Sequence, residues 1–107
     1  MAVNFSYSQN LAQTIKGIVI DKDNRRPLAG ATISIADDSI QQTVLSNEIG
    51  VFTLKNIPVG RRQIQCTYSG YENYITDNIL LNSAKEVELI IELEQQYQQQ
   101  AEVIVKA

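Results

Sequence analysis

Three groups of carboxylates come nearest, by residue type and spacing, to the makings of a chemical site in this chain. Asp21 and Asp23, with Asn24 beside them, supply the oxygen ligands of half a calcium loop. The later glycine and bidentate glutamate of an EF-hand loop do not follow, and Arg25 and Arg26 come directly after. We therefore expect an ordinary polar turn that ends a strand, and no metal site.

The other two groups are Asp37-Asp38 and the three glutamates Glu86, Glu88 and Glu92. A pair of carboxylates is the minimum that glycoside hydrolysis requires. The glutamates, however, alternate with apolar residues in a strand-like run, so we expect them to face water while their neighbours are buried. Asp37-Asp38 is expected to be a solvated loop tip.

Other reactive groups are scarce in the sequence. It contains no histidine, which excludes Ser-His and Cys-His catalysis and histidine-ligated metals. Cys66 is the single cysteine, and its place in an apolar-alternating run predicts a small core residue. No Gly-x-Ser-x-Gly elbow, Ser-x-x-Lys pair or glycine-rich phosphate loop occurs. We expect a protein that is not an enzyme, with no catalytic residue, metal or cofactor.

Two further groups have a binding or covalent interpretation to weigh. Lys16 near a carboxylate and an asparagine would suit the isopeptide bond of some pilin-type sandwiches, but nothing in the spacing supports one. Tyr68, Tyr71 and Tyr74 could form an aromatic platform for a sugar. Because Tyr68 and Tyr74 lie at strand spacing, we expect them to pack in the core and at its rim instead.

The elements that must position these residues are short β-strands. The chain has 107 residues, 44% of them hydrophobic, which suffices for one core. Five glycines and two prolines punctuate it, and the apolar period between them is two. The expected strands are residues 15–21, 31–36, 42–46, 51–55, 61–68, 71–81 (bent) and 86–93. The sequence thus predicts an all-β, antiparallel sandwich of seven strands.

The two ends of the chain depart from this pattern. Residues 1–13 lack the basic and apolar regions of a complete secretory signal and are expected to be flexible, either as a native start or as the trimmed tail of a precursor. After the sandwich of residues 14–93, the Gln-rich residues 94–100 predict a linker. Residues 101–107 form a short apolar run, either a strand for another protein's sheet or one more edge strand of this sandwich.

The charge and hydropathy of the chain argue against nucleic-acid binding and against a membrane-spanning helix. The formal net charge is −3 and no basic block occurs, so nucleic acid is not an expected partner. No apolar run approaches the roughly 18 residues that a membrane-spanning helix needs. Protein or small-molecule contacts remain.

Short motifs follow one another along residues 14–93 in a specific order. They are Gly17-x-Val19-x-Asp21, Pro27-Leu28-x-Gly30-Ala31-x-Ile33-x-Ile35, Asn47-Glu48-x-Gly50-x-Phe52-x-Leu54, Ile57-Pro58-x-Gly60, Ser69-Gly70-Tyr71 and the closing strand Leu89–Leu93. Together they resemble the carboxypeptidase-regulatory-like domain, a transthyretin-like (prealbumin-like) β-sandwich. Asn47, where aspartate is usual, and Ile49, where a polar residue is usual, are departures within one hairpin.

The resemblance implies a scaffold without an active site, since transthyretin-like hydrolases rely on histidines. It also implies a setting, the periplasmic N-terminal extension of Bacteroidetes-type TonB-dependent (SusC-like) outer-membrane receptors. In that setting a linker, a TonB box, a plug and a barrel follow the sandwich.

The C-terminal run then resembles a TonB box or a first plug strand. Its candidate partner-binding residues are Glu102, Val103, Ile104, Val105 and Lys106. The implied partners are a TonB-like energy transducer, bound by β-augmentation, and the receptor's own plug and barrel. The implied location is the periplasm and outer membrane. The alternative is a stand-alone or tandem module that binds carbohydrate or a cell-surface protein.

Overall fold

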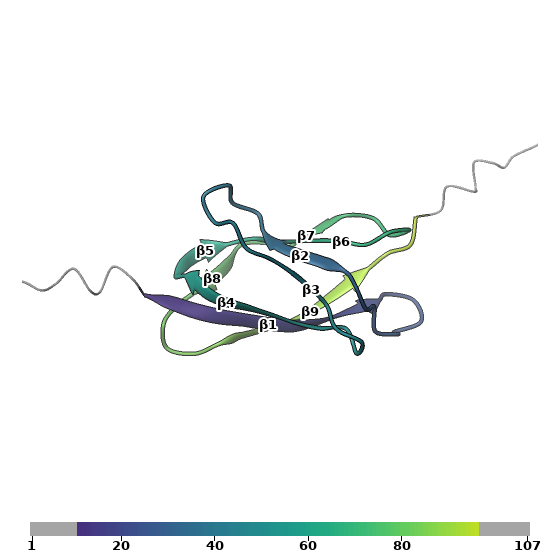
Figure 1. The fold of residues 1–107 in the computed structure, drawn as a ribbon, viewed down its shortest axis with the longest axis horizontal. Helices are drawn as coiled ribbons and strands as arrows, with labels where there is room; N and C mark the ends of the chain where they lie inside the picture. The colour runs from purple at the N-terminus through teal and green to yellow at the C-terminus, as the bar shows by residue number, and fades with distance from the viewer. Residues whose placement is uncertain (1–10, 97–107) are drawn as a thin grey trace, which may run out of the picture.

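Nine β-strands and no helix make up residues 11–96, the part of the chain that the computed structural model describes (Figure 1). The strands are β1 (Ala12–Asp21), β2 (Thr32–Ile35), β3 (Thr43–Leu45), β4 (Val51–Pro58), β5 (Gly60–Arg62), β6 (Ile64–Thr67), β7 (Tyr74–Ile75), β8 (Ile79–Leu81) and β9 (Val87–Leu93). The predicted all-β class is confirmed. Within this range no apolar helix of membrane-spanning length occurs.

The first sheet has the strand order β4-β1-β9, with β1 in the middle. β1 pairs antiparallel with β4 and parallel with β9, whereas the sequence predicted antiparallel strands throughout. The reason is that residues 82–86 return the chain to the start of β1, where Gln13 donates to the Asn82 carbonyl at 3.2 Å. From that point β9 can only run in the same direction as β1.

The parallel pairing matches β1 and β9 in unbroken register, from Ile15 opposite Val87 to Asp21 opposite Leu93. We call these two paired stretches the terminal ladder. β1 begins at one end of the described body and β9 finishes at the other end (Figure 1). The first and last strands of the described chain are thus direct neighbours that leave in opposite directions.

The second sheet has the order β3-β2-β6-β7, and β5 pairs with β8 in a separate ribbon. Two of the expected strands are therefore each divided in two. The strand expected over 61–68 breaks at Gln63, and the one expected over 71–81 breaks around Thr76. The Thr76 hydroxyl accepts the backbone N–H of Ile64 at 3.0 Å and holds the two breaks side by side.

β4 is longer than the expected strand 51–55, because Asn56, Ile57 and Pro58 continue it. The register against β1 shifts between Gln13 and Ile15, which places an extra residue on β4. Asn56, with φ of 59°, adopts the left-handed conformation there. Asparagine tolerates this conformation, so Asn56 forms a β-bulge and the strand continues past it.

The hydrophobic core fills the space between the sheets. Its buried members are Ile15, Val19, Leu28, Ala31, Ile33, Ile35, Phe52, Leu54, Ile57, Ile64, Cys66, Leu81, Ile91 and Leu93. Every strand of four or more residues contributes at least two of them at alternate positions, as the period of two predicts.

Two glycines are required by close approaches to this core. A Cβ on Gly17 would come within 2.9 Å of the Phe52 ring. Gly50 has φ of 80°, and a Cβ there would lie 2.7 Å from the Val19 carbonyl oxygen. The hairpin before Gly50 keeps its turn despite the departure at Asn47, whose side-chain oxygen accepts the N–H groups of Ile49 and Val51 at 3.0 and 2.9 Å.

Candidate functional site

The predicted partner-binding residues Glu102, Val103, Ile104, Val105 and Lys106 lie outside the described residues. Their role stays a prediction. The described chain does show where the segment that carries them leaves the sandwich. At that exit point, the end of β9, side-chain hydrogen bonds join residues that are 50 and 74 positions apart in the sequence.

Asp21 is the centre of this network. It is the last residue of β1 and is only 1% exposed. Its Oδ1 accepts the backbone N–H groups of Asp23 and Asn24 at 2.7 and 3.1 Å. Its Oδ2 accepts the Tyr71 hydroxyl at 2.5 Å and the Gln95 side-chain amide at 2.9 Å. We call Asp21, Tyr71 and Gln95, with these two backbone N–H groups, the Asp21 cluster.

The cluster favours the ionised carboxylate strongly. The hydrogen bonds from Gln95 and Tyr71, followed by the N–H of Asn24, hold the pKa of Asp21 far below its ordinary value. The same contact acts in reverse on its partner, because the Asp21 carboxylate raises the pKa of the Tyr71 hydroxyl that donates to it. Both groups keep their ordinary charge at neutral pH.

The carboxylate of Asp21 belongs to the group that has the composition of half a calcium loop. In the structure, hydrogen-bond donors surround this carboxylate. Both Asp21 oxygens are occupied by N–H and O–H groups, which leaves no room for a cation among them. No cluster of three metal-ligating side chains occurs within residues 11–96. Asp21 is a buried structural carboxylate at the end of β1, which is where the sequence predicted the first strand to end. The alternation Ile15, Gly17, Val19, Asp21 places it on the inward face, and this signal was present in the sequence.

The exit segment 94–96 is paired on the side away from β1. Glu72 donates its N–H to the Glu94 carbonyl at 2.8 Å, and Gln96 donates to the Gly70 carbonyl at 2.9 Å. On the other side, Lys22 donates its N–H to the Leu93 carbonyl at 2.9 Å. Residues 94–96, which the sequence assigned to the linker, are therefore paired with the β6–β7 loop, and the Gln95 side chain is also bonded to Asp21 of β1.

Glu86, just before β9, and Glu88 and Glu92 of β9 face outward, as predicted, and two of the three form ion pairs. Glu86 lies 3.6 Å from Lys16, and both side chains are about half exposed. Glu92 pairs with Arg25. Glu88 is exposed. Glu86 and Glu92 are paired with cations and all three side chains reach solvent, so they form no buried acid pair of the kind that hydrolysis needs.

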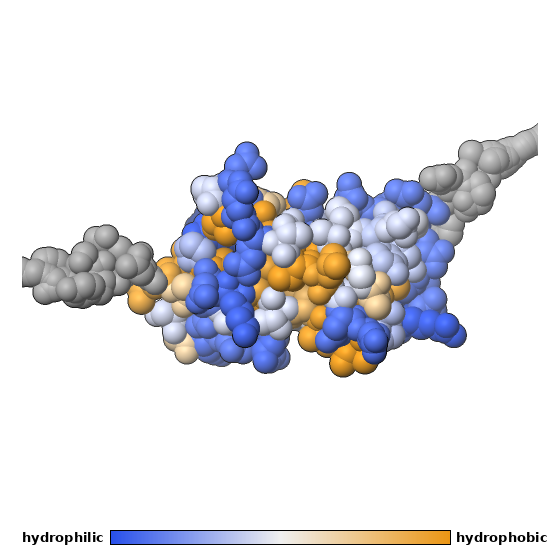
Figure 2. Space-filling view, viewed as in Figure 1, coloured by the Kyte–Doolittle hydropathy of each residue, from blue (hydrophilic) through white to orange (hydrophobic). Residues whose placement is uncertain are grey.

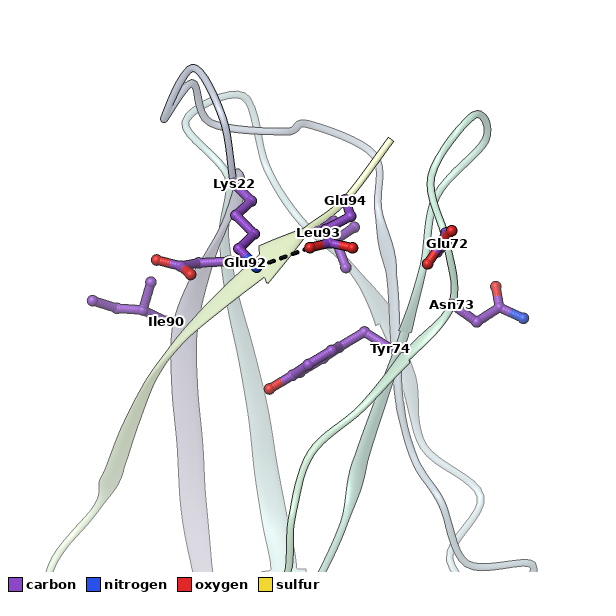
Figure 3. Close-up of a pocket in the computed structure, with 8 residues that line it drawn as sticks. All are labelled: Lys22, Glu72, Asn73, Tyr74, Ile90, Glu92, Leu93 and Glu94. Atoms are coloured by element: carbon purple, nitrogen blue, oxygen red, sulfur yellow. Dashed lines mark hydrogen bonds and ion pairs between the residues drawn. The ribbon is translucent and has the colours of Figure 1, made fainter. Parts of the chain in front are cut away.

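The three tyrosines do not form one platform. Tyr68 and Tyr71 pack against each other with ring centroids 5.5 Å apart and are partly buried on the core. Tyr74 stands apart and is 38% exposed. Figure 3 shows its ring reaching from its own strand toward β9.

Tyr74 lines a shallow open pocket between β9 and the segment before β7. The other lining residues are Lys22, Glu72, Asn73, Ile90, Glu92, Leu93 and Glu94. Lys22 donates to Glu94 at 2.8 Å across its upper edge, and this hydrogen bond raises the pKa of Lys22. The pocket combines one aromatic face with charged groups, of which Lys22, Glu92 and Glu94 take part in ion pairs.

The remaining predicted residues keep their structural roles. Asp37 accepts the N–H and hydroxyl of Ser39 in an exposed loop, and these bonds lower its pKa. Cys66 is fully buried, and burial raises the pKa of its thiol to about 11. A buried thiol of that pKa is a poor nucleophile.

The outer surface shows no single large apolar area on the face seen in Figure 2. Apolar residues there form small areas among polar ones. Among residues 11–96, the exposed large apolar side chains include Leu45 and Ile49. Areas of this kind are ordinary for a soluble surface. On that face, nothing resembles a dedicated docking patch.

Residues 11–96 thus form a β-sandwich with a buried structural carboxylate. A family model of the carboxypeptidase regulatory-like domain matches residues 14–94. The chain belongs to that family, as its motifs predicted. A search of curated proteins gives no significant match.

Solved structures share the fold. The major pilin subunit of Bacillus cereus is 23% identical with a TM-score of 0.61, covering 77% of this chain and 30% of its own. A chain of a type II cohesin–X-dockerin complex from Acetivibrio cellulolyticus is 18% identical with a TM-score of 0.64, covering 76% and 56%. A candidate carbohydrate-binding protein from Bacteroides uniformis is 11% identical with a TM-score of 0.60, covering 77% and 41%.

These neighbours are much longer than the matching region, since this chain spans between 30% and 56% of the three. They are a pilin subunit, part of a cohesin–dockerin complex and a candidate carbohydrate-binding protein. At these identities the likeness establishes the fold, a β-sandwich domain, and the residues of any interaction must come from this chain itself.

Proposed function

We propose that this chain is a non-catalytic accessory domain of a TonB-dependent outer-membrane receptor, working in the periplasm through protein contacts. In this proposal residues 14–93 are the scaffold, and residues 101–107 are the segment that binds a TonB-like energy transducer. Of the predicted N-terminal segment 1–13, Ala12 and Gln13 already belong to β1, and residues 1–10 lie outside the described residues.

One observation carries the proposal. The family match ends at residue 94, and β9 ends at Leu93, after which residues 94–96 are paired with the β6–β7 loop and bonded to Asp21. The apolar run of residues 101–107 therefore follows a completed domain. An apolar segment of strand-forming residues in that position is suited to adding a strand to a partner's sheet, where backbone hydrogen bonds supply affinity.

The test is binding of the full chain to the periplasmic C-terminal domain of the TonB-type transducer from the same organism, measured by calorimetry. Ile104→Pro and Val105→Pro are made separately, because alternate residues of an added strand donate their N–H groups to the partner. One of the two must then remove a bonded N–H, and we expect its affinity to fall about tenfold or more. Gln98→Pro, in the predicted linker, is the matched control.

The proposal predicts that Gln98→Pro binds like the unaltered chain. It would be wrong if the unaltered chain failed to bind the transducer domain, or if both proline substitutions at 104 and 105 left the affinity unchanged. Circular dichroism of each variant confirms that the sandwich is intact.

A second candidate function, carbohydrate binding, is favoured by the exposed ring of Tyr74 in its open pocket beside Asn73. Aromatic faces with neighbouring polar groups suit sugar rings. A glycan array with the full chain and with Tyr74→Ala tests this function. Sugar binding that Tyr74→Ala abolishes would support it, whereas the receptor proposal expects no sugar bound at all.

A further inference from the structure

We infer that the described sandwich is a force-bearing element, which resists tension applied between its two ends by shear of the terminal ladder. The inference goes beyond the proposed function and needs neither the receptor nor the transducer. It rests on strand order, register and side-chain contacts within residues 11–96.

The first step is the direction of the two end strands. β1 and β9 are neighbours and run parallel, and they leave the body at opposite ends (Figure 1). Tension between Leu11 and Gln96 therefore pulls the two strands in opposite directions along their common axis. Ladder hydrogen bonds lie across the strands, so all of them carry the force together and none can break first by peeling.

The second step is the core beneath the ladder. Sliding β9 by one residue would turn its inward side chains to the outer face. Ile91 and Leu93 of β9 are 1% exposed, and Ile15 and Val19 of β1 are fully buried. Sliding the ladder therefore also exposes core surface, which adds to the barrier that forced unfolding must cross.

The third step is the side chains that join the same two segments. Three ion pairs connect residues around β1 to residues around β9: Lys16–Glu86, Lys22–Glu94 and Arg25–Glu92. All are partly exposed, so each alone contributes little. They lie at both ends of the ladder and oppose sliding along it. Among the four ion pairs formed by residues 11–96, only Arg62–Asp37 lies elsewhere.

The fourth step is the exit of the chain. Tension on the C-terminal side first reaches residues 94–96, which are paired with Gly70 and Glu72 on one side. The Gln95 amide is also bonded to the buried Asp21 carboxylate, at the last residue of β1. Peeling the exit segment would leave that buried charge with fewer donors, which opposes fraying where the force enters.

The experiment is single-molecule force spectroscopy on the full 107-residue chain in two pulling geometries. In the first, handles are fused at the two termini. In the second, one handle is at the N-terminus and the other is attached through Ser83→Cys, in the exposed loop before β9. Because Ile15 lies opposite Val87 at that end, the second geometry peels the ladder one pair at a time.

We expect the unfolding force in the first geometry to be several-fold higher at the same pulling speed. Gln95→Ala should lower the force in the first geometry and leave the second unchanged. Gln41→Ala, which alters an exposed glutamine in the β2–β3 loop, is the matched control and should change neither.

Equal forces in the two geometries would overturn the inference, as would an effect of Gln95→Ala of the same size in both. Neither outcome depends on transducer binding. A chain that fails to bind the transducer can still show the difference between geometries, so the two proposals fail separately.

Discussion

Two aspartates of this chain begin turns of the same local kind and have opposite surroundings. Asp21 accepts the N–H groups of Asp23 and Asn24, and Asp37 accepts the N–H and hydroxyl of Ser39. Asp21 is 1% exposed and is also bound by side chains 50 and 74 residues further along the chain. Asp37 is exposed, and its remaining contact is an ion pair of 3.7 Å.

The comparison separates what a turn contributes locally from what burial adds. Both carboxylates have lowered pKa values, because each accepts hydrogen bonds in its ionised form. Only at Asp21 do those bonds connect three distant parts of the fold. Stability should therefore depend on Asp21 and hardly at all on Asp37.

The largest expected effect comes from alanine at the two positions. Asp21→Ala leaves the part-buried donors of Tyr71 and Gln95 without their acceptor, and we expect the melting temperature to fall by roughly 10 °C. Asp37→Ala should change it by about 2 °C or less, as exposed substitutions do. Tyr71→Phe removes one of the four donors to Asp21, and its loss of melting temperature should lie between those of the two alanine variants. Equal losses at Asp21 and Asp37, measured by thermal denaturation, would contradict the comparison.

A smaller effect should appear in the pH dependence of stability. The pKa of Asp21 is lower in the folded chain than in the unfolded chain, so the unfolded chain takes up the proton first as pH falls. Its contribution is full above the unfolded pKa of about 4 and is lost progressively below it.

The measurement is the free energy of unfolding in urea, from pH 7 to pH 2, for the unaltered chain and for Asp21→Asn. The difference between the two should be largest at pH 7 and should shrink below about pH 4. Asp37→Asn serves as the control and should follow the unaltered chain closely. A difference that stayed constant with pH would show that the Asp21 charge is irrelevant.

The smallest effect is expected beside the Asp21 cluster, at the half-exposed ion pair of Lys22 and Glu94. Lys22→Gln should change the melting temperature by no more than about 2 °C, and less in high salt. A larger, salt-independent loss would mean that proximity to the buried cluster matters more than exposure. Thermal denaturation at two salt concentrations decides between these outcomes.

Much of the fold could be predicted because its signals are local. The alternation in residues 86–93 and 51–55 fixes which side chains are buried, and the glycines at 30, 50 and 70 mark turns with positive φ. The break at Gln63, and the change of strand partner at Thr76 where the sequence predicts only a bend, could not be predicted. They arise because two neighbouring strands change partners together, and that depends on pairing between residues 12 or more positions apart.

The parallel pairing of β1 and β9 is non-local in the same way. Nothing within either strand records the direction of its partner, and only the course of residues 82–86 determines it. The Asp21 cluster could be predicted from the sequence only in part. Its turn was readable from Asp21, Asp23 and Asn24, and its inward position followed from the alternation in β1. Tyr71 and Gln95 carried no sign that they would meet it.

The buried cysteine gives this protein a built-in reporter of opening. Because Cys66 is fully enclosed and its pKa is raised to about 11, thiol reagents should leave it untouched while β6 stays packed. A dye can then be placed selectively on an introduced surface cysteine, as in the Ser83→Cys variant. Labelling at Cys66, followed over time by mass spectrometry, would count how often the sandwich opens.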